Sequence, residues 1–126
     1  MAKQAIWPGS PVDGAPYSPG IRSGSLVFVS GQVPLDPSTR SIVSGEFEDR
    51  VRQCIANVER VLIADGLGLE HVVKVTVFLT DLDMFGRLNA VYTPVWGETK
   101  PARSCVQVSR LPMDVDVEIE AIAVAP

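Results

Sequence analysis

The fold of this 126-residue chain is decided by residues 46–65, which have the sequence EFEDRVRQCIANVERVLIAD. Acidic residues open this stretch, where they complement the positive end of a helix dipole, and Gly66 follows it as a typical helix stop. Its apolar residues recur at spacings of three and four, which places them on one stripe of an α-helix. The stripe consists of Val51, Cys54, Ile55, Val58, Val61 and Leu62.

Segments typical of β-strands lie on both sides of this helix. They are short and rich in β-branched residues, and Gly, Pro, Asp or Ser residues bound them. The predicted strands are residues 25–30, continued at 32–35 past a bend or bulge at Gly31, a short strand at Ile42 and Val43, and residues 72–80, 103–108 and 115–124.

A second, shorter helix follows residues 72–80, with Asp81 as its predicted cap. Four apolar residues share one face of it until Pro94 disturbs the pattern: Phe85, Leu88, Val91 and Tyr92. Residues 1–24, by contrast, contain four prolines and four glycines, and this composition predicts an irregular arm with turns.

The order of strands, helix, strand, helix, strand and strand predicts an α+β fold. We expect a two-layer sandwich in which two helices cover one face of a mixed sheet of about six strands. No repeat or linker divides the chain, so residues 1–126 are predicted to form a single domain. Because two helices cannot cover both faces of such a sheet, we expect the open face to be buried by association into a homo-oligomer.

Composition and motifs narrow the possible functions. Eleven Lys and Arg against fifteen Asp and Glu give a net charge of −4, which disfavours nucleic-acid binding. Two cysteines and one histidine are too few for a structural zinc site. The sequence has no phosphate loop, dinucleotide fingerprint or paired-ligand metal motif, so we expect neither cofactor nor metal. No apolar run is long enough for a membrane span or a signal peptide, which favours a cytoplasmic protein with reduced thiols.

Arg103 is a candidate for binding a carboxylate. It lies in the segment PARSC, residues 101–105, at the junction between a proline-containing loop and a strand. The planar fork of arginine suits a carboxylate held by two hydrogen bonds. Taken alone, however, the position is better explained by a surface arginine paired with an acidic neighbour.

Glu118 is a candidate for moving protons. It is the middle one of three carboxylates, with Asp116 and Glu120, that alternate with apolar residues on a strand. A carboxylate in a partly apolar site can activate water or shuttle a proton. The spacing gives no reason to choose among the three, and a solvated strand face explains them all.

Five other residues give weaker signals or none. Tyr17 on the arm either closes over a site or packs into a neighbouring subunit. Ser30 and Gly31 offer a hydroxyl and an approachable backbone amide at a strand end. Cys105 follows Arg103 by two residues and is expected on the same side of the strand, where an inert buried thiol is the ordinary interpretation. The single histidine, His71, is interpreted as a turn residue.

Together these pieces resemble the reactive intermediate (imine) deaminase family, also called the YjgF or Rid family. The resemblance spans nearly the whole chain and depends on many matches in the correct order. The matching segments are residues 16–18 (PYS), 26–37 (LVFVSGQVPLDP), 73–81 (VKVTVFLTD), 89–92 (NAVY), 101–105 (PARSC), 110–112 (RLP) and 118–123 (EIEAIA).

The resemblance implies a homotrimer of chorismate-mutase-like subunits, with active sites in the clefts between neighbours. It also implies cofactor-independent hydrolysis of reactive enamines and imines, such as 2-iminopropanoate and 2-iminobutanoate, to 2-oxo acids and ammonia. On this analogy Arg103 holds the substrate carboxylate, while Glu118 positions water and moves protons. The other positions that match the family's pocket are Tyr17, Ser30, Gly31, Phe85, Asn89 and Cys105.

Three departures from the family pattern leave the substrate open. Pro19 stands where many members have glutamine, the connection over residues 93–100 is shorter and contains Pro94, and Gln107 occupies a position that is frequently acidic. The alternatives are a non-catalytic protein that binds carboxylate metabolites and a deaminase specific to one pathway. A ribonuclease or a chaperone-like protein is a further alternative, which the net charge disfavours where RNA is concerned.

Overall fold

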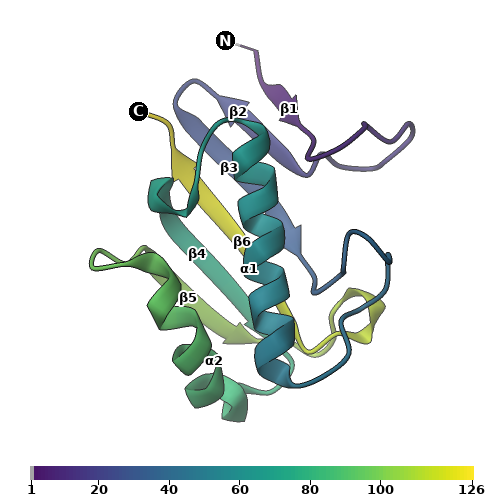
Figure 1. The fold of residues 1–126 in the computed structure, drawn as a ribbon, viewed down its shortest axis with the longest axis vertical. Coiled ribbons are helices and arrows are strands. Elements are labelled where there is room, and N and C mark those ends of the chain that lie inside the picture. The colour runs from purple at the N-terminus through teal and green to yellow at the C-terminus, as the bar shows by residue number, and fades with distance from the viewer. Residues whose placement is uncertain (1) are drawn as a thin grey trace.

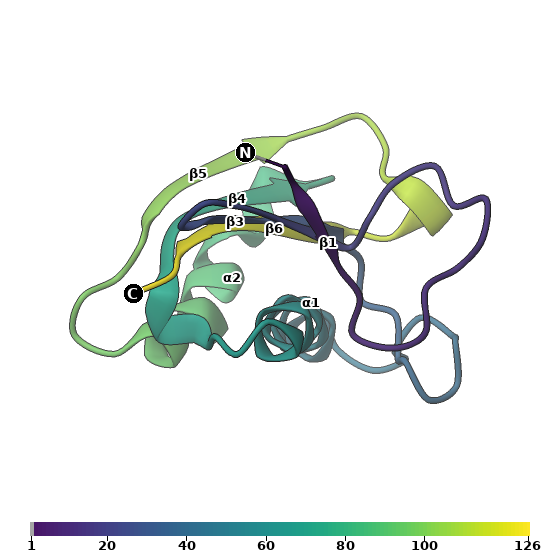
Figure 2. The ribbon, with the colours of Figure 1, turned by 90° about the horizontal axis from the view of Figure 1, so that it is seen from above.

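The computed structural model describes residues 2–126 and consists of one six-stranded sheet with two α-helices on one face (Figures 1 and 2). This arrangement confirms the predicted α+β sandwich. The helices are α1 (Phe47–Ala64) and α2 (Phe85–Tyr92). The strands are β1 (Gln4–Ile6), β2 (Gly20–Ser23), β3 (Leu26–Gln32), β4 (Val72–Leu79), β5 (Ala102–Gln107) and β6 (Val117–Val124).

The sheet has the strand order β1-β2-β3-β6-β4-β5. Every neighbouring pair is antiparallel except β4 and β5, which are parallel and are joined by the crossover that contains α2. The register between β3 and β6 shifts between Val29 and Gln32, which confirms the irregularity predicted at Gly31. This shift interrupts regular pairing beside Gly31 on β3 and Glu118 on β6.

Helix α1 forms where the apolar spacing predicted it. The Asp49 carboxylate accepts a hydrogen bond from the Glu46 backbone N–H at 3.0 Å, and Gly66 has a φ of 76° just beyond the helix end. The first feature satisfies a backbone N–H at the start of the helix, and the second ends the helix. The apolar stripe packs against β3, whose buried residues include Val27 and Val29, against β6 and against α2.

The predicted irregular arm over residues 1–24 is wrong for two short segments, because β1 and β2 form there and extend the edge of the sheet. The four prolines all lie between these two strands, which leaves the backbone of each strand free to pair. At Gly20 a Cβ atom would come within 2.7 Å of the Val61 side chain, so a side-chain-free residue lets β2 approach α1.

Two smaller expectations also need correction. The strand predicted at Ile42 and Val43 is a single bridge between Leu35 and Ile42, because the turn around it leaves no room for a longer ladder. Phe85 was predicted to share the buried face of the second helix, but its side chain is 42% exposed while Leu88, Val91 and Tyr92 are buried. Phe85 is the first residue of α2, and the next turn of the helix carries the buried Leu88.

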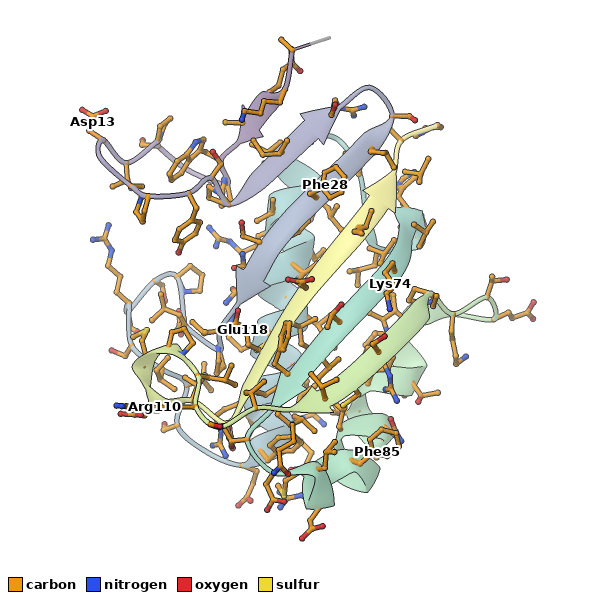
Figure 3. The ribbon with its side chains drawn as sticks, turned by 180° about the vertical axis from the view of Figure 1, so that it is seen from behind. Asp13, Phe28, Lys74, Phe85, Arg110 and Glu118 are labelled. Atoms are coloured by element: carbon orange, nitrogen blue, oxygen red, sulfur yellow. The ribbon has the colours of Figure 1, made fainter. Side chains whose placement is uncertain are left out.

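The face of the sheet away from the helices is open (Figure 3). It carries exposed apolar side chains, among them Leu26, Phe28, Val106 and Val124, beside Lys74 and Glu118. The predicted uncovered face is therefore confirmed, whereas its burial by other subunits stays a prediction. Among residues 2–126, no helix is long and apolar enough to cross a membrane.

Candidate active site

Arg103 lies on the helix side of the sheet. In the parallel pairing of β4 and β5 it is the partner of Val75, which is fully buried beneath the helices. Helix α2 presents Phe85, Asn89 and Tyr92 to it. These residues are four and then three positions apart, which places them on one face of a helix.

Together, these three residues surround the Arg103 guanidinium. Its Cζ atom lies 4.8 Å from the centre of the Tyr92 ring and 5.2 Å from the centre of the Phe85 ring, and Nη1 donates a hydrogen bond to Asn89 Oδ1 at 2.8 Å. Within residues 2–126 this is the one hydrogen bond that the guanidinium donates. Arginine has five N–H donors in a rigid fork, so most of the fork stays available to a planar anion.

Cys105 lies on the same side of β5 as Arg103, as its spacing predicted. Its partner across the ladder is the buried Val77, and the thiol packs partly against the core. Burial raises the pKa of the Cys105 thiol, and the charge of Arg103 opposes that rise. A thiol with a raised pKa is protonated at neutral pH and is therefore a poor nucleophile, so it lines the site rather than attacking.

Glu118 lies on the opposite, open face of the sheet, where its partner on β4 is Phe78. A Cβ atom built on Gly31 would overlap the Glu118 carboxylate, so only glycine permits this close approach. Beside the carboxylate is a cavity of about 500 Å³. It is lined by Tyr17, Ser30, Gly31, Val33, Leu35, Pro112, Met113, Glu118 and Glu120.

The structure separates the three carboxylates that the sequence could not distinguish. Asp116 is bound by both arms of the Arg50 guanidinium, at 2.9 and 2.8 Å. Glu120 is exposed, whereas Glu118 is half-buried. Burial and, to a smaller extent, the charge of Glu120 raise the pKa of Glu118. A raised pKa makes a carboxylate a stronger base, which suits a group that accepts a proton and returns it.

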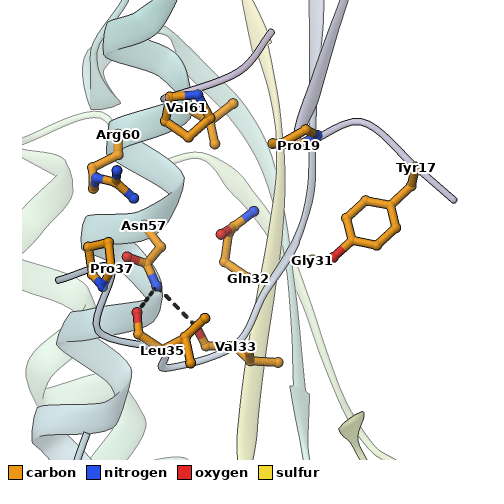
Figure 4. A pocket seen from close by; sticks show the side chains of 11 residues that line it. Tyr17, Pro19, Gly31, Gln32, Val33, Leu35, Pro37, Asn57, Arg60 and Val61 are labelled. Carbon is orange, nitrogen blue, oxygen red and sulfur yellow. Dashed lines mark hydrogen bonds between the residues drawn. The ribbon is translucent and has the colours of Figure 1, made fainter. Parts of the chain in front are cut away.

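Ser30 fixes the arm that brings Tyr17 to this cavity. The Ser30 hydroxyl donates a hydrogen bond to the Ser18 carbonyl at 2.7 Å, and its backbone N–H donates to the Pro19 carbonyl at 2.9 Å. The Tyr17 side chain is 65% exposed and is directed toward the backbone at Gly31 (Figure 4). Ser30 thus contributes to the site by holding the backbone of the arm.

Asn57 supports the same region and was missed as a functional position. It is buried, and its Nδ2 donates to the carbonyls of Val33 at 3.1 Å and Leu35 at 2.8 Å, bonds that Figure 4 shows within a neighbouring pocket. Val33 and Leu35 line both this pocket and the cavity beside Glu118, so Asn57 fixes the loop between them. A signal was present in the sequence, because Asn57 interrupts the apolar stripe next to Val58. A buried polar residue of this kind is retained where it has hydrogen-bond partners.

The candidate residues therefore form two groups that do not meet within one chain. Arg103, Phe85, Asn89 and Cys105 lie together at α2 and β5, on the helix side of the sheet. Tyr17, Ser30, Gly31 and Glu118 lie together on the open face. His71 belongs to neither group, since its Nδ1 accepts a hydrogen bond from the Gly68 N–H in a turn, as expected. Across residues 2–126, no three His, Cys, Asp or Glu side chains gather into a metal site.

Solved proteins share this fold of two helices over a six-stranded mixed sheet. The family model described as Endoribonuclease L-PSP matches residues 9–125. The chain belongs to this family, the YjgF or Rid family, as its sequence resemblance predicted.

Two relatives show the range of names within the family. The chain is 50% identical over 108 residues to a RutC family protein of Pyrococcus horikoshii, covering 86% of each chain. It is 43% identical over 127 residues to the 2-iminobutanoate/2-iminopropanoate deaminase of Salmonella typhimurium, covering 98% of each. The family thus includes proteins named as deaminases of reactive intermediates.

Solved structures agree with this placement. The chain superposes on Escherichia coli TdcF with bound serine with a TM-score of 0.88 and 43% identity, covering 98% of this chain and 99% of the other. The YjgF gene product of E. coli gives a TM-score of 0.88 and 40% identity, with the same coverage. The roles of the individual site residues in this chain stay predictions.

Proposed function

We propose that this protein hydrolyses 2-imino acids, and their enamine tautomers, to 2-oxo acids and ammonia without a cofactor. The observation that carries the proposal is the arrangement of two complementary charges. Arg103 offers a free guanidinium edge on one side of the sheet, and Glu118 offers a carboxyl group of raised pKa on the other.

Because these two groups face opposite sides, the proposed site is completed by a neighbouring copy of the chain. We propose a homotrimer in which the open sheet faces pack together. The exposed apolar residues of that face, such as Phe28 and Val106, are what such an interface buries. Arg103 lies on β5, the edge strand of the sheet, so that at the rim of this interface it meets Glu118 and the arm of the next copy.

Arg103 binds the substrate carboxylate in this proposal. Its Asn89 bond and the two flanking rings hold the guanidinium, so little side-chain freedom remains to be lost on binding. A carboxylate held by two parallel hydrogen bonds also fixes the orientation of the imine carbon next to it.

Glu118 moves the protons. Its carboxylate accepts a proton from water as the water oxygen bonds to the imine carbon, and the electron pair of the C=N π bond moves to nitrogen. The glutamic acid then returns this proton to the nitrogen. Glu118 then takes the hydroxyl proton of this amino alcohol and passes it to the nitrogen. As the C–N bond breaks, ammonia leaves with the bonding pair, an oxygen electron pair forms the C=O bond, and the product is a 2-oxo acid.

The names of relatives support this reaction class. A relative at 43% identity is named for deaminating 2-iminobutanoate and 2-iminopropanoate, the two substrates expected here. The reaction needs neither metal ligands nor a nucleophilic thiol, because water is the attacking group. Arg103 binds the substrate carboxylate, and Glu118 activates the water.

The test is the release of ammonia from 2-iminopropanoate formed in situ by an amino-acid oxidase. We expect wild type to accelerate it and Arg103→Ala to abolish the acceleration while the oligomer stays intact by light scattering. Arg103→Lys is the matched control. It keeps the charge but loses the fork, and we expect about a tenfold or greater loss. Unchanged turnover in Arg103→Ala contradicts the proposal.

One observation favours a second candidate, a protein that binds carboxylate metabolites without turnover. TdcF, the solved relative described above, carries bound serine, an amino acid with a carboxylate. The same Arg103 arrangement would serve such binding. The two functions are separated by calorimetric titration with serine: Arg103-dependent binding in a protein that does not accelerate hydrolysis favours the second candidate.

A further inference from the structure

The surroundings of Arg103 include a residue that the sequence did not single out for the site. Tyr92 lies closer to the guanidinium than Phe85 does, with 4.8 Å against 5.2 Å from the ring centre to Cζ. The two rings also differ in freedom. Tyr92 is 4% exposed, whereas Phe85 is 42% exposed at the start of α2. The buried ring is therefore the fixed one of the pair.

The fixed Tyr92 ring restricts a rotation of the Arg103 guanidinium that its hydrogen bond to Asn89 permits. The bond to Asn89 Oδ1 fixes one N–H but permits rotation about that contact. An aromatic face attracts a cation placed over it and favours a guanidinium stacked on the ring. The Tyr92 ring and Asn89 together thus determine where the remaining N–H edge points.

It is the ring of Tyr92, not its hydroxyl, that has contacts. Among residues 2–126 the buried Tyr92 hydroxyl has no hydrogen-bond partner. The ring also lies against Trp96, with 5.3 Å between centres and a tilt of 51°. The contacts with Arg103 and Trp96 are both made by the aromatic ring, which supports a role for the ring face at this position.

We propose that Tyr92 is a positioning residue. Its ring holds the Arg103 guanidinium in the plane in which the free N–H edge meets the substrate carboxylate. This inference rests on the proposed role of Arg103. It adds to that role the reason for an aromatic residue one helical turn after Asn89.

The experiment compares Tyr92→Phe, Tyr92→Leu and Trp96→Leu with wild type. Phe keeps the ring and removes only the unpartnered hydroxyl, whereas Leu removes the ring. Trp96→Leu is the matched structural control, because it loosens the same helix end without contacting the guanidinium. Each variant is titrated with pyruvate, which carries the same carboxylate and does not react, and is assayed with 2-iminopropanoate.

We expect Tyr92→Leu to raise the Kd for pyruvate and the KM by about tenfold while kcat changes less than about threefold. Tyr92→Phe and Trp96→Leu should stay within about twofold of wild type in KM, although Trp96→Leu lowers the Tm. In nitrogen-15 NMR spectra the Arg103 Nε–H signal should carry a ring-current shift in wild type and Tyr92→Phe that Tyr92→Leu loses.

The outcomes separate this inference from the proposed function. Wild-type turnover with an unchanged KM in Tyr92→Leu overturns the inference alone, as does an equal rise in KM in Trp96→Leu. A wild-type protein that neither binds pyruvate nor accelerates hydrolysis overturns the proposed function and the role of Tyr92 with it.

Discussion

The two halves of the candidate site are built in different ways. The half at α2 and β5 consists of side chains at helical spacing, and it holds one guanidinium between rings and an amide. The half at β3 and β6 consists of backbone irregularities: the register shift near Gly31, the arm tied to Ser30, and a loop in which Met113 has a φ of 60°. The charge proposed to bind the substrate is thus held by helix residues, whereas the charge proposed to move protons lies on β6 beside a cavity lined largely by loop residues.

The largest effect should follow from Glu118→Gln, which removes the proton carrier and leaves the Arg103 half unchanged. We expect kcat to fall by about 100-fold or more with little change in KM. The matched control is Glu120→Gln, since Glu120 lines the same cavity but is exposed. Steady-state ammonia release measures the kcat of both variants. A loss of less than a few-fold in Glu118→Gln would show that Glu118 does not take part in proton transfer.

The same glycine substitution in each half gives the next comparison. Gly31→Ala places a methyl group where the Glu118 carboxylate lies, so we expect about a tenfold loss of kcat/KM. Gly86 in α2 has no atom within 4 Å of a built Cβ, so Gly86→Ala should keep full activity and raise stability by about 0.5–1 kcal/mol. Equal activity in the two variants would show that Gly31 is not needed for the approach of Glu118.

The free energy of unfolding should depend on the hydrogen bonds that Asn57 donates to the loop beside Glu118. Asn57→Ala leaves the buried carbonyls of Val33 and Leu35 without their donor and should cost about 1–3 kcal/mol of unfolding free energy. Gln53→Ala is the control, because it removes the donor to Asn57 Oδ1 and leaves both carbonyls bonded. Urea denaturation of both variants checks this, and an equal cost in the two would contradict the role of Asn57.

The smallest expected effect concerns pH. Burial raises the pKa of Glu118 above its ordinary 4.5, so the folded chain holds this proton more tightly than the unfolded chain. The resulting stability is present below pH 4.5 and is lost as the pH rises through the folded-state pKa. Glu118→Gln should therefore have a slightly higher Tm than wild type at pH 7. The Tm values of the two proteins should become equal below pH 4.5. A lower Tm for Glu118→Gln than for wild type at pH 7 would contradict a raised pKa.

A related expectation concerns activity. Because water is activated by the charged form of Glu118, kcat/KM should fall as the pH is lowered through its raised pKa. The pH profile of Asn89→Ala, which alters the other half, should keep the same midpoint. A profile without an acidic limb would exclude a carboxylate base.

The sequence predicted those parts of the fold that depend on local periodicity. The stripe that includes Val51 and Leu62 defined α1 to within a residue at each end. Strands β1 and β2 were not predicted, because they form by pairing along an existing sheet edge and their own residues carry little β propensity. The exposure of Phe85 was also out of reach, since it depends on where α2 leaves the sheet edge.

For the site, spacing placed Cys105 on the side of Arg103 but could not place Glu118 relative to either. The face on which a strand residue lies is set by the ladder, and here Arg103 pairs in the row of Val75 while Glu118 pairs with Phe78. Choosing Glu118 over Asp116 required the family resemblance. The structure adds a physical reason, because Arg50 already neutralises Asp116.

The position of Arg103 and Glu118 on opposite faces has a genetic consequence in the proposed trimer. The copy that lends the arginine to a site is not the copy that lends the glutamate, so two inactive alleles can rescue one another. If Arg103→Ala and Glu118→Gln chains are refolded together in equal amounts, about a quarter of the sites pair an intact arginine with an intact glutamate. Activity should return in the mixture although each chain alone is inactive, and doubling either chain should lower the recovered fraction.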